Sequence, residues 1–203
     1  NNGGNILAWL AEKFLAKEGK EEQYEKIFAA VENVPAGSRG LIFLPYLHGE
    51  RAPIWDEKSC GVFFGIISLH DRDFFARAAM EGVCFALKEI LTSIELLSGT
   101  IGQLRISGAV SASEVMLQML ADVTGKVVSV QEGSDASATG AAYLALKELG
   151  AINAYADLPV SDKKFIWPDT NSMTVYQNQF AIYQTLYPAL KEAMHSLHQL
   201  TAH

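Results

Sequence analysis

Two short apolar strands in the second half of the chain each run into a helix through a turn of small residues. A strand pattern at residues 104–106 leads into helical spacing over residues 113–124, and the β-branched segment 126–130 leads into a helix over 138–149. An order of strand, helix, strand, helix predicts parallel strands joined by right-handed crossovers. This feature predicts an α/β fold.

The rest of the chain is mostly helical by the spacing of its apolar residues. The aromatic residues of the tail alternate with polar ones, so we expect the tail helix to pack on the outside. The spacing predicts helices at residues 6–17, 21–32, 71–97 and 174–200, strands at 40–44 and 61–67, and an ordered loop at 45–60.

Composition restricts the class of protein. The chain has 203 residues, of which 49% are hydrophobic, and this is enough to bury a core as a single domain. A net charge of −7 argues against a sequence-independent grip on nucleic acid phosphates. No apolar run is long enough to span a membrane. Two cysteines make no disulfide framework, so we expect a cytoplasmic protein. From the charge and the short apolar runs we expect neither nucleic acid nor membrane partners.

Several frequent catalytic motifs are missing from the sequence. It has no Gly-x-x-x-x-Gly-Lys-Ser/Thr loop, no Gly-x-Gly-x-x-Gly fingerprint, no Gly-x-Ser-x-Gly elbow and no His-Glu-x-x-His pair. His195 and His198 lie one turn apart on the predicted last helix, but no third ligand is near in sequence. We interpret them as a solvent-exposed helix face. Cys60 lacks a neighbouring His, so we predict neither a catalytic thiolate nor a metal site.

The turn between residues 106 and 113 is built from small residues, Ile-Ser-Gly-Ala-Val-Ser-Ala-Ser. A strand that ends in such a turn and feeds a helix brings backbone amides and a positive helix end to one point, where a nucleotide can approach. Tight packing of the helix on its sheet would select the same residues. A second small-residue turn over residues 134–142 leaves the same two interpretations open.

Several segments follow one another along the chain in a characteristic order. They are Gly3-Gly4-Asn5 with Trp9-Leu10, residues 44–56 (LPYLHGERAPIWD), 61–66 (GVFFGI) and 77–82 (RAAMEG), Ser107-Gly108-Ala109 through Ser113 to 118–122 (QMLAD), and 135–142 (DASATGAA). In this order they resemble the carboxy-terminal half of the FGGY carbohydrate kinases, over about residues 1–160. Phe74 departs from the family, which usually has a polar residue there.

This resemblance implies one lobe of the actin-like ATPase fold, related to ribonuclease H and carrying extra helices. Family members use Mg-ATP to phosphorylate a sugar hydroxyl in a cleft between two lobes. The resemblance places Gly4 and Ala8 at nucleotide contacts, Gly108 and Ala109 at the turn beside the adenosine and phosphates, and Ser113 at the purine end. Ala8 lacks a side-chain hydrogen bond that some relatives make, and Ala109 replaces a common glycine.

The resemblance also implies what this chain does not contain. The catalytic-base aspartate, a phosphate-gripping Gly-Thr-Gly turn and the sugar-binding lobe belong upstream of Asn1, so no catalytic residue and no metal ligand is expected within the chain, and residues 161–203 form a helical extension. We expect the chain alone to be inactive. A homodimer is left open.

Within the family, the segments at 49–56 and 61–65 look most similar to gluconate kinases and next to xylulose kinases. This suggests gluconate or a ketopentose such as xylulose as the substrate of the longer protein. Glu50 and Arg51 either shape the cleft or form an ion pair that stabilises their loop. Trp55 is interpreted as a packing anchor rather than a sugar platform.

Two alternatives to a kinase lobe are kept. One is a non-catalytic nucleotide-binding or interaction module of the same fold, in which Ala8 and Ala109 record lost nucleotide contacts. The other is an ordinary α/β domain that uses its small-residue turns only for packing.

Overall fold

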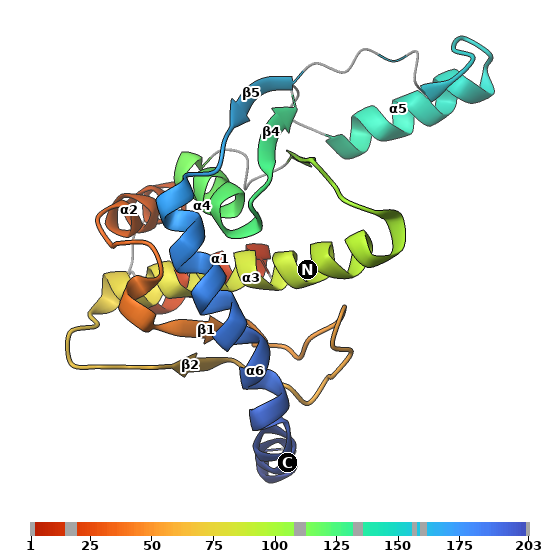
Figure 1. The fold of residues 1–203 in the computed structure, drawn as a ribbon. Coiled ribbons are helices and arrows are strands. Elements are labelled where there is room, and N and C mark those ends of the chain that lie inside the picture. Colours follow the sequence, from red (N-terminus) through yellow and green to blue (C-terminus); the bar gives the residue numbers. More distant parts are fainter. Residues whose placement is uncertain are drawn as a thin grey trace.

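The computed structural model describes residues 3–14, 20–107, 113–131, 136–155, 158 and 162–201. Figure 1 shows how its elements are arranged. In chain order they are α1 (Gly3–Phe14), α2 (Lys20–Glu32), the 3-10 turn η1 (Ser38–Gly40), β1 (Ile42–Leu44), β2 (Val62–Phe64), α3 (Arg72–Ser98), β3 (Gln103–Ile106), α4 (Glu114–Thr124), β4 (Val127–Gln131), α5 (Ala136–Glu148), β5 (Asp162–Ile166) and α6 (Thr170–Thr201).

Helix α3 runs through the middle of the molecule, and α1, α2, α4 and β1 all pack against it. Its start is fixed by Asp71, whose side chain accepts hydrogen bonds from the amides of Asp73 at 3.0 Å and Phe74 at 3.4 Å. At Gly82 a Cβ atom would lie 2.3 Å from the carbonyl oxygen of Phe43. Glycine therefore lets β1 pack directly on the helix.

The strands form two separate sheets. Strands β1 and β2 pair antiparallel as a hairpin, with Phe43 opposite Phe63. Strands β3, β4 and β5 form the other sheet in that order, and β3 pairs parallel with β4. In Figure 1 the hairpin and this second sheet lie on opposite sides of α3. The parallel pair predicted from the order of elements is confirmed.

Strand β5 was not expected from the sequence. Its residues are mainly polar, and only Phe165 and Ile166 supply apolar side chains. The strand forms because β4 has a second edge, along which Val128 lies opposite Ile166 and Val130 opposite Lys164 in antiparallel register. Such pairing depends on β4 rather than on a local apolar pattern.

Helix α6 confirms the predicted tail helix, but the expectation that it packs on the outside is wrong. Tyr176 and Tyr183 are fully buried in the main hydrophobic cluster, and Phe180 is nearly so. Phe85 of α3 contacts all three rings, and the hydroxyl groups of Tyr46 and Tyr183 lie 3.2 Å apart. The aromatic residues form one continuous helix face, and this face is part of the core.

A buried polar cluster joins α6 to α3 and to the turn before β1. The carboxylate of Glu81 accepts hydrogen bonds from the Gly37 amide at 2.9 Å, the Ser38 hydroxyl at 2.7 Å and the Tyr176 hydroxyl at 2.9 Å. Arg77 completes the cluster through its Nε, 2.9 Å from the same carboxylate. Glu81 therefore fixes the turn that leads into β1.

The loop over residues 45–60 corrects one further prediction. Trp55 is not a packing anchor, because 75% of its surface is exposed. The residue that anchors this loop is Asp56, whose Oδ2 accepts a hydrogen bond from the Tyr187 hydroxyl at 2.7 Å and lies 2.7 Å from His195 Nε2. In the part of the chain that the structure describes, no helix is both long and apolar enough to cross a membrane.

Candidate functional site

The predicted strand and the predicted helix on either side of the turn are present where the sequence places them. Strand β3 ends at Ile106 and α4 begins at Glu114. Gly108 and Ala109, two of the predicted nucleotide contacts, lie outside the described residues. Ser113 is described, and it caps α4: its hydroxyl oxygen accepts a hydrogen bond from the Met116 amide at 3.3 Å. The amide end of α4, which attracts anions, thus follows directly on the predicted nucleotide turn.

Ser113 is buried, with only 4% of its surface exposed. A serine hydroxyl has two lone pairs and one proton, and the bond from Met116 uses one lone pair. Among the residues that the structure describes, no acceptor takes the proton. The contact with a purine that the resemblance implies would need this proton.

Helix α1 carries the other two predicted contacts, Gly4 and Ala8. Ala8 is exposed, whereas Ile6 and Leu10 on the opposite face are fully buried. Helix α1, which contains Ala8, and helix α4, which Ser113 caps, both pack on α3. Gly4 lies in the first turn of α1.

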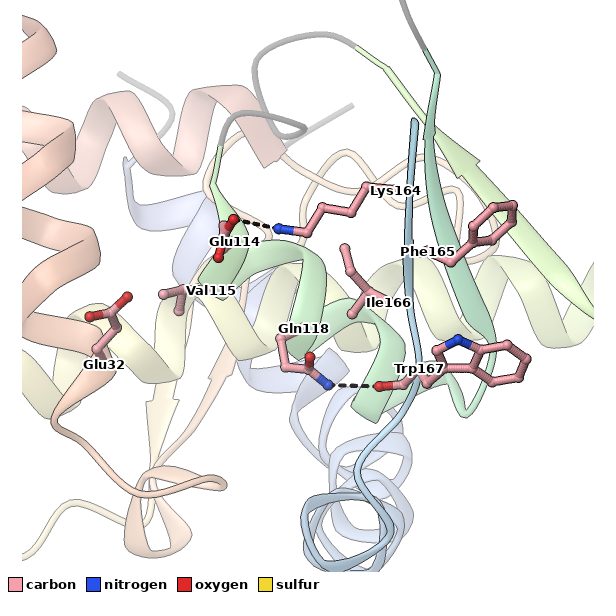
Figure 2. A pocket seen from close by; sticks show the side chains of 8 residues that line it. All are labelled: Glu32, Glu114, Val115, Gln118, Lys164, Phe165, Ile166 and Trp167. Carbon is pink, nitrogen blue, oxygen red and sulfur yellow. Dashed lines mark hydrogen bonds and ion pairs between the residues drawn. The ribbon is translucent and has the colours of Figure 1, made fainter. Parts of the chain in front are cut away.

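A pocket of about 450 Å³ opens beside the start of α4 (Figure 2). One wall comes from the first two turns of α4, the other from β5 and the residue after it, and Glu32 at the end of α2 also lines it. Lys164 and Ile166 point from β5 toward α4, whereas the rings of Phe165 and Trp167 point to the other side of the strand. This alternation is that of an extended strand, and it leaves a polar rim over an apolar floor.

An ion pair crosses the pocket beside the helix end. The ammonium group of Lys164 contacts the carboxylate of Glu114 (Figure 2). The hydrogen bond and charge of Lys164 lower the pKa of Glu114, so this carboxylate is ionised at neutral pH. Without its partner, Glu114 would place an uncompensated negative charge in the first turn of α4. The pair thus preserves the positive character of this helix end.

Gln118, which lines the pocket, and Asp122, which lies one turn further along α4, have roles that were not predicted. Gln118 Nε2 donates to the Trp167 carbonyl at 3.0 Å and to Asp122 Oδ1 at 2.8 Å. The same oxygen accepts from the Asp169 amide at 2.8 Å. These bonds tie the segment between β5 and α6 to α4. Both residues lie in a segment that carries the family resemblance, which was the available signal.

The structure also bears on the histidines and the cysteine. His195 is not simply part of a solvent-exposed face, because it pairs with Asp56; His198 is exposed. Cys60 is a free, partly buried thiol. Among the described residues, no three His, Cys, Asp or Glu side chains are grouped so that they could hold a metal ion.

Comparison with known proteins finds similar sequences among sugar kinases. The chain is 34% identical to a gluconokinase of Bacillus licheniformis over 162 residues. This matched stretch covers 76% of this chain and 32% of the relative. It is 29% identical over 192 residues to a xylulose kinase of Bacillus subtilis, covering 93% of this chain and 38% of the relative. The chain thus spans well under half the length of the curated relatives it matches.

The fold has a solved counterpart in the ligand-bound xylulose kinase from Lactobacillus acidophilus. The TM-score is 0.86 at 28% identity, over 97% of this chain and 40% of that one. This confirms the expected actin-like ATPase fold of sugar kinases. Residues 1–149 match the C-terminal domain of the FGGY family of carbohydrate kinases. The chain therefore belongs to the FGGY family of carbohydrate kinases and carries its C-terminal domain.

Proposed function

We propose that this chain is the nucleotide-binding lobe of a sugar kinase that transfers the γ-phosphate of ATP to a hydroxyl group of gluconate or of a ketopentose such as xylulose. The observation that carries the proposal is the capped amide end of α4 directly after the predicted turn, beside a pocket of a size suited to a small ligand. The named relatives, gluconokinase and xylulose kinase, support the two substrate classes.

The nucleotide would lie against the turn between β3 and α4. Ser113 would donate its hydroxyl proton to the purine, Gly108 and Ala109 would allow close approach of the adenosine and phosphates, and Gly4 and Ala8 would present a surface without bulky side chains. Bound Mg-ATP supplies the phosphoryl group. We propose that Mg²⁺ is held mainly by the phosphates and by parts of the kinase outside these 203 residues.

Exposed apolar side chains support a larger protein around this lobe. Helix α5 lies apart from the other elements in Figure 1, and Leu144 on it and Leu149 directly after it are 62% and 81% exposed. Leu96 and Leu97 at the end of α3 are even more exposed. Apolar surface of this kind is typical of a covered interface. We propose that the remainder of the kinase covers it, and that the chain alone therefore does not turn over substrate.

A titration of the 203-residue chain with ADP, followed by calorimetry, tests the proposal. Saturable binding that Gly108→Asp reduces at least tenfold and Ser113→Ala reduces about fivefold is expected. Asp at position 108 would bring a negative charge to the phosphates. An exposed change far from the site, Glu148→Gln, is the matched control. Equal affinity in all four proteins would contradict the nucleotide assignment.

The non-catalytic alternative is distinguished in the longer protein. Phosphorylation of gluconate or xylulose that is lost with Gly108→Asp supports the kinase. Nucleotide binding without transfer to any sugar would favour a binding module of the same fold.

A further inference from the structure

A groove of about 540 Å³ lies between the loop over residues 45–60 and α6. The loop and α6 form this groove. Ala8 and Ser113 lie elsewhere, in α1 and at the start of α4. Nearly all of its lining residues are polar or charged. They are His48, Gly49, Glu50, Arg51, Trp55, Asp56, Glu57, Lys58 and His195.

The loop that forms most of the groove is closed by its own backbone. The amide and carbonyl groups of Glu50 and Asp56 exchange two hydrogen bonds of 2.9 Å, and the Trp55 amide donates to the Arg51 carbonyl at 2.6 Å. Gly49 has a φ of +72°, and a Cβ atom there would lie 2.8 Å from Glu57 Cα. Arg51 and Trp55 therefore stand on a preformed turn.

Two acidic side chains of the groove already have donors. Asp56 Oδ1 accepts from the Lys58 amide at 3.0 Å, and its Oδ2 is engaged by Tyr187 and His195. Glu50 is buried, and its Oε1 accepts from the Arg51 amide at 2.8 Å. Neither carboxylate is directed at a ligand, because these bonds hold the loop on itself and on α6.

The basic side chains of the groove differ from these two carboxylates. Arg51 and Lys58 are exposed, and within the described residues neither forms an ion pair. The indole of Trp55, 75% exposed, lies on the same turn. Glu57 is the exposed carboxylate of the lining. The groove thus combines an accessible aromatic face with two cationic groups that have no carboxylate partner.

We propose that this groove binds an anionic carbohydrate, with the sugar carbons on the face of Trp55 and the carboxylate or phosphate group on Arg51 and Lys58. An indole face suits the C–H groups of a polyhydroxy chain, and a guanidinium binds either anionic group through two hydrogen bonds. His48, which also lines the groove, can form a hydrogen bond with a sugar hydroxyl. The inference does not depend on the nucleotide site, because no residue is shared.

The experiment titrates the 203-residue chain with D-gluconate, D-gluconate 6-phosphate and the neutral polyol sorbitol, and follows the indole signal of Trp55 by NMR. Both anions are expected to bind saturably and sorbitol at least tenfold more weakly. The relative affinity of the two anions distinguishes a carboxylate site from a phosphate site. Arg51→Gln and Lys58→Gln should each weaken binding about fivefold, and Glu57→Gln should strengthen it by a similar factor.

Arg72→Gln, an exposed arginine outside the groove, is the matched control and should leave affinity unchanged. Circular dichroism verifies that each variant is folded. Trp55→Leu, which lacks the indole signal and is followed through the backbone amide signals of Arg51 and Lys58, should bind neither anionic sugar. The proposal is overturned if sorbitol binds as tightly as gluconate, if inorganic phosphate competes as well as the sugar phosphate, or if the Arg51, Lys58 and Arg72 variants behave alike. ADP affinity, measured in the same samples, reports separately on the proposed function.

Discussion

The guanidinium Nε of Arg77 lies 2.9 Å from the carboxylate of Glu81, one turn further along α3, and both side chains are largely buried. Through its other nitrogens Arg77 donates to the Val31 carbonyl at 2.8 Å and to the Tyr176 hydroxyl at 3.0 Å. Burial raises the pKa of Glu81, and Arg77 and the hydrogen bonds of the Gly37–Ser38 turn oppose that rise. One ion pair therefore joins α2, α3, α6 and the turn before β1.

Removal of the Glu81 charge should destabilise the fold strongly. Glu81→Gln leaves the guanidinium of Arg77 buried without a carboxylate, so the free energy of unfolding should fall by about 3 kcal/mol. Tyr176→Phe removes a hydroxyl that bonds to both charged groups but leaves the ion pair in place, so it should cost less, about 2 kcal/mol. Urea unfolding measures both, with the exposed Glu148→Gln as the control. A Glu81→Gln protein as stable as the control would show that the cluster is not a structural clamp.

Asp56 should make the protein acid-sensitive. Burial acts to raise the pKa of Asp56, but the bonds from His195 and Tyr187 lower it to about 2, against an ordinary value of 3.8. A lowered carboxyl pKa stabilises the fold above about pH 4, and this contribution is lost as the pH falls toward 2.

Thermal unfolding from pH 5 to pH 2 checks this. The midpoint should fall more steeply for the native protein than for Asp56→Asn, which has no group to titrate. Parallel curves for the two proteins would mean that Asp56 does not anchor the loop to α6.

Glu89 should make the protein less stable as the pH rises. Burial, with a smaller effect of the Glu50 charge, raises the pKa of Glu89 from 4.5 to about 7. A raised carboxyl pKa gives stability that is present below about pH 4.5 and lost as the pH rises through 7. Glu89→Gln should therefore unfold at a higher temperature than the native protein at pH 8. A variant less stable than the native protein at that pH would contradict this.

The ion pair beside α4 should affect nucleotide affinity. Lys164→Gln removes the partner of Glu114 and leaves an uncompensated negative charge beside the proposed nucleotide site, so the anionic ADP should bind about fivefold more weakly. The double variant Glu114→Gln/Lys164→Gln should regain native affinity, because it removes both charges. Calorimetric titration of the three proteins measures the effect. A double variant as weak as the single one would assign the loss to the lysine itself.

Local patterns predicted the elements of this fold well. The parallel pair β3 and β4, helix α4 and the long helix α3 all follow from apolar spacing near in sequence, whereas the cap that Ser113 forms on α4 was not predicted. Strand β5 could not be predicted in this way, because Asp162–Ile166 has no alternating pattern and pairs only where β4 offers an edge.

The contacts within the polar clusters also could not be predicted from local patterns. Glu81 lies in a segment that resembles the family, yet its partners Gly37 and Tyr176 are 44 and 95 positions away. Asp56 meets His195 across 139 positions. Spacing within one helix cannot indicate such contacts. For the same reason the buried face of α6 was not anticipated, since its burial depends on Phe85 in α3.

The candidate site was predicted mainly by resemblance. Small residues at 106–113 left both nucleotide binding and close packing open, and only the order of the family segments favoured a nucleotide. Ser113 is confirmed as the residue at the start of α4, whereas its contact with a purine stays a prediction.

The most direct test of the nucleotide lobe is an amide NMR spectrum of the isotope-labelled chain recorded while ADP is added to saturation. We predict that the largest shifts fall on Ser107, Ser113, Glu114 and the first turns of α1, and that the loop at 45–60 stays unchanged. Shifts confined to that loop and α6, or no shifts at all, would contradict the account.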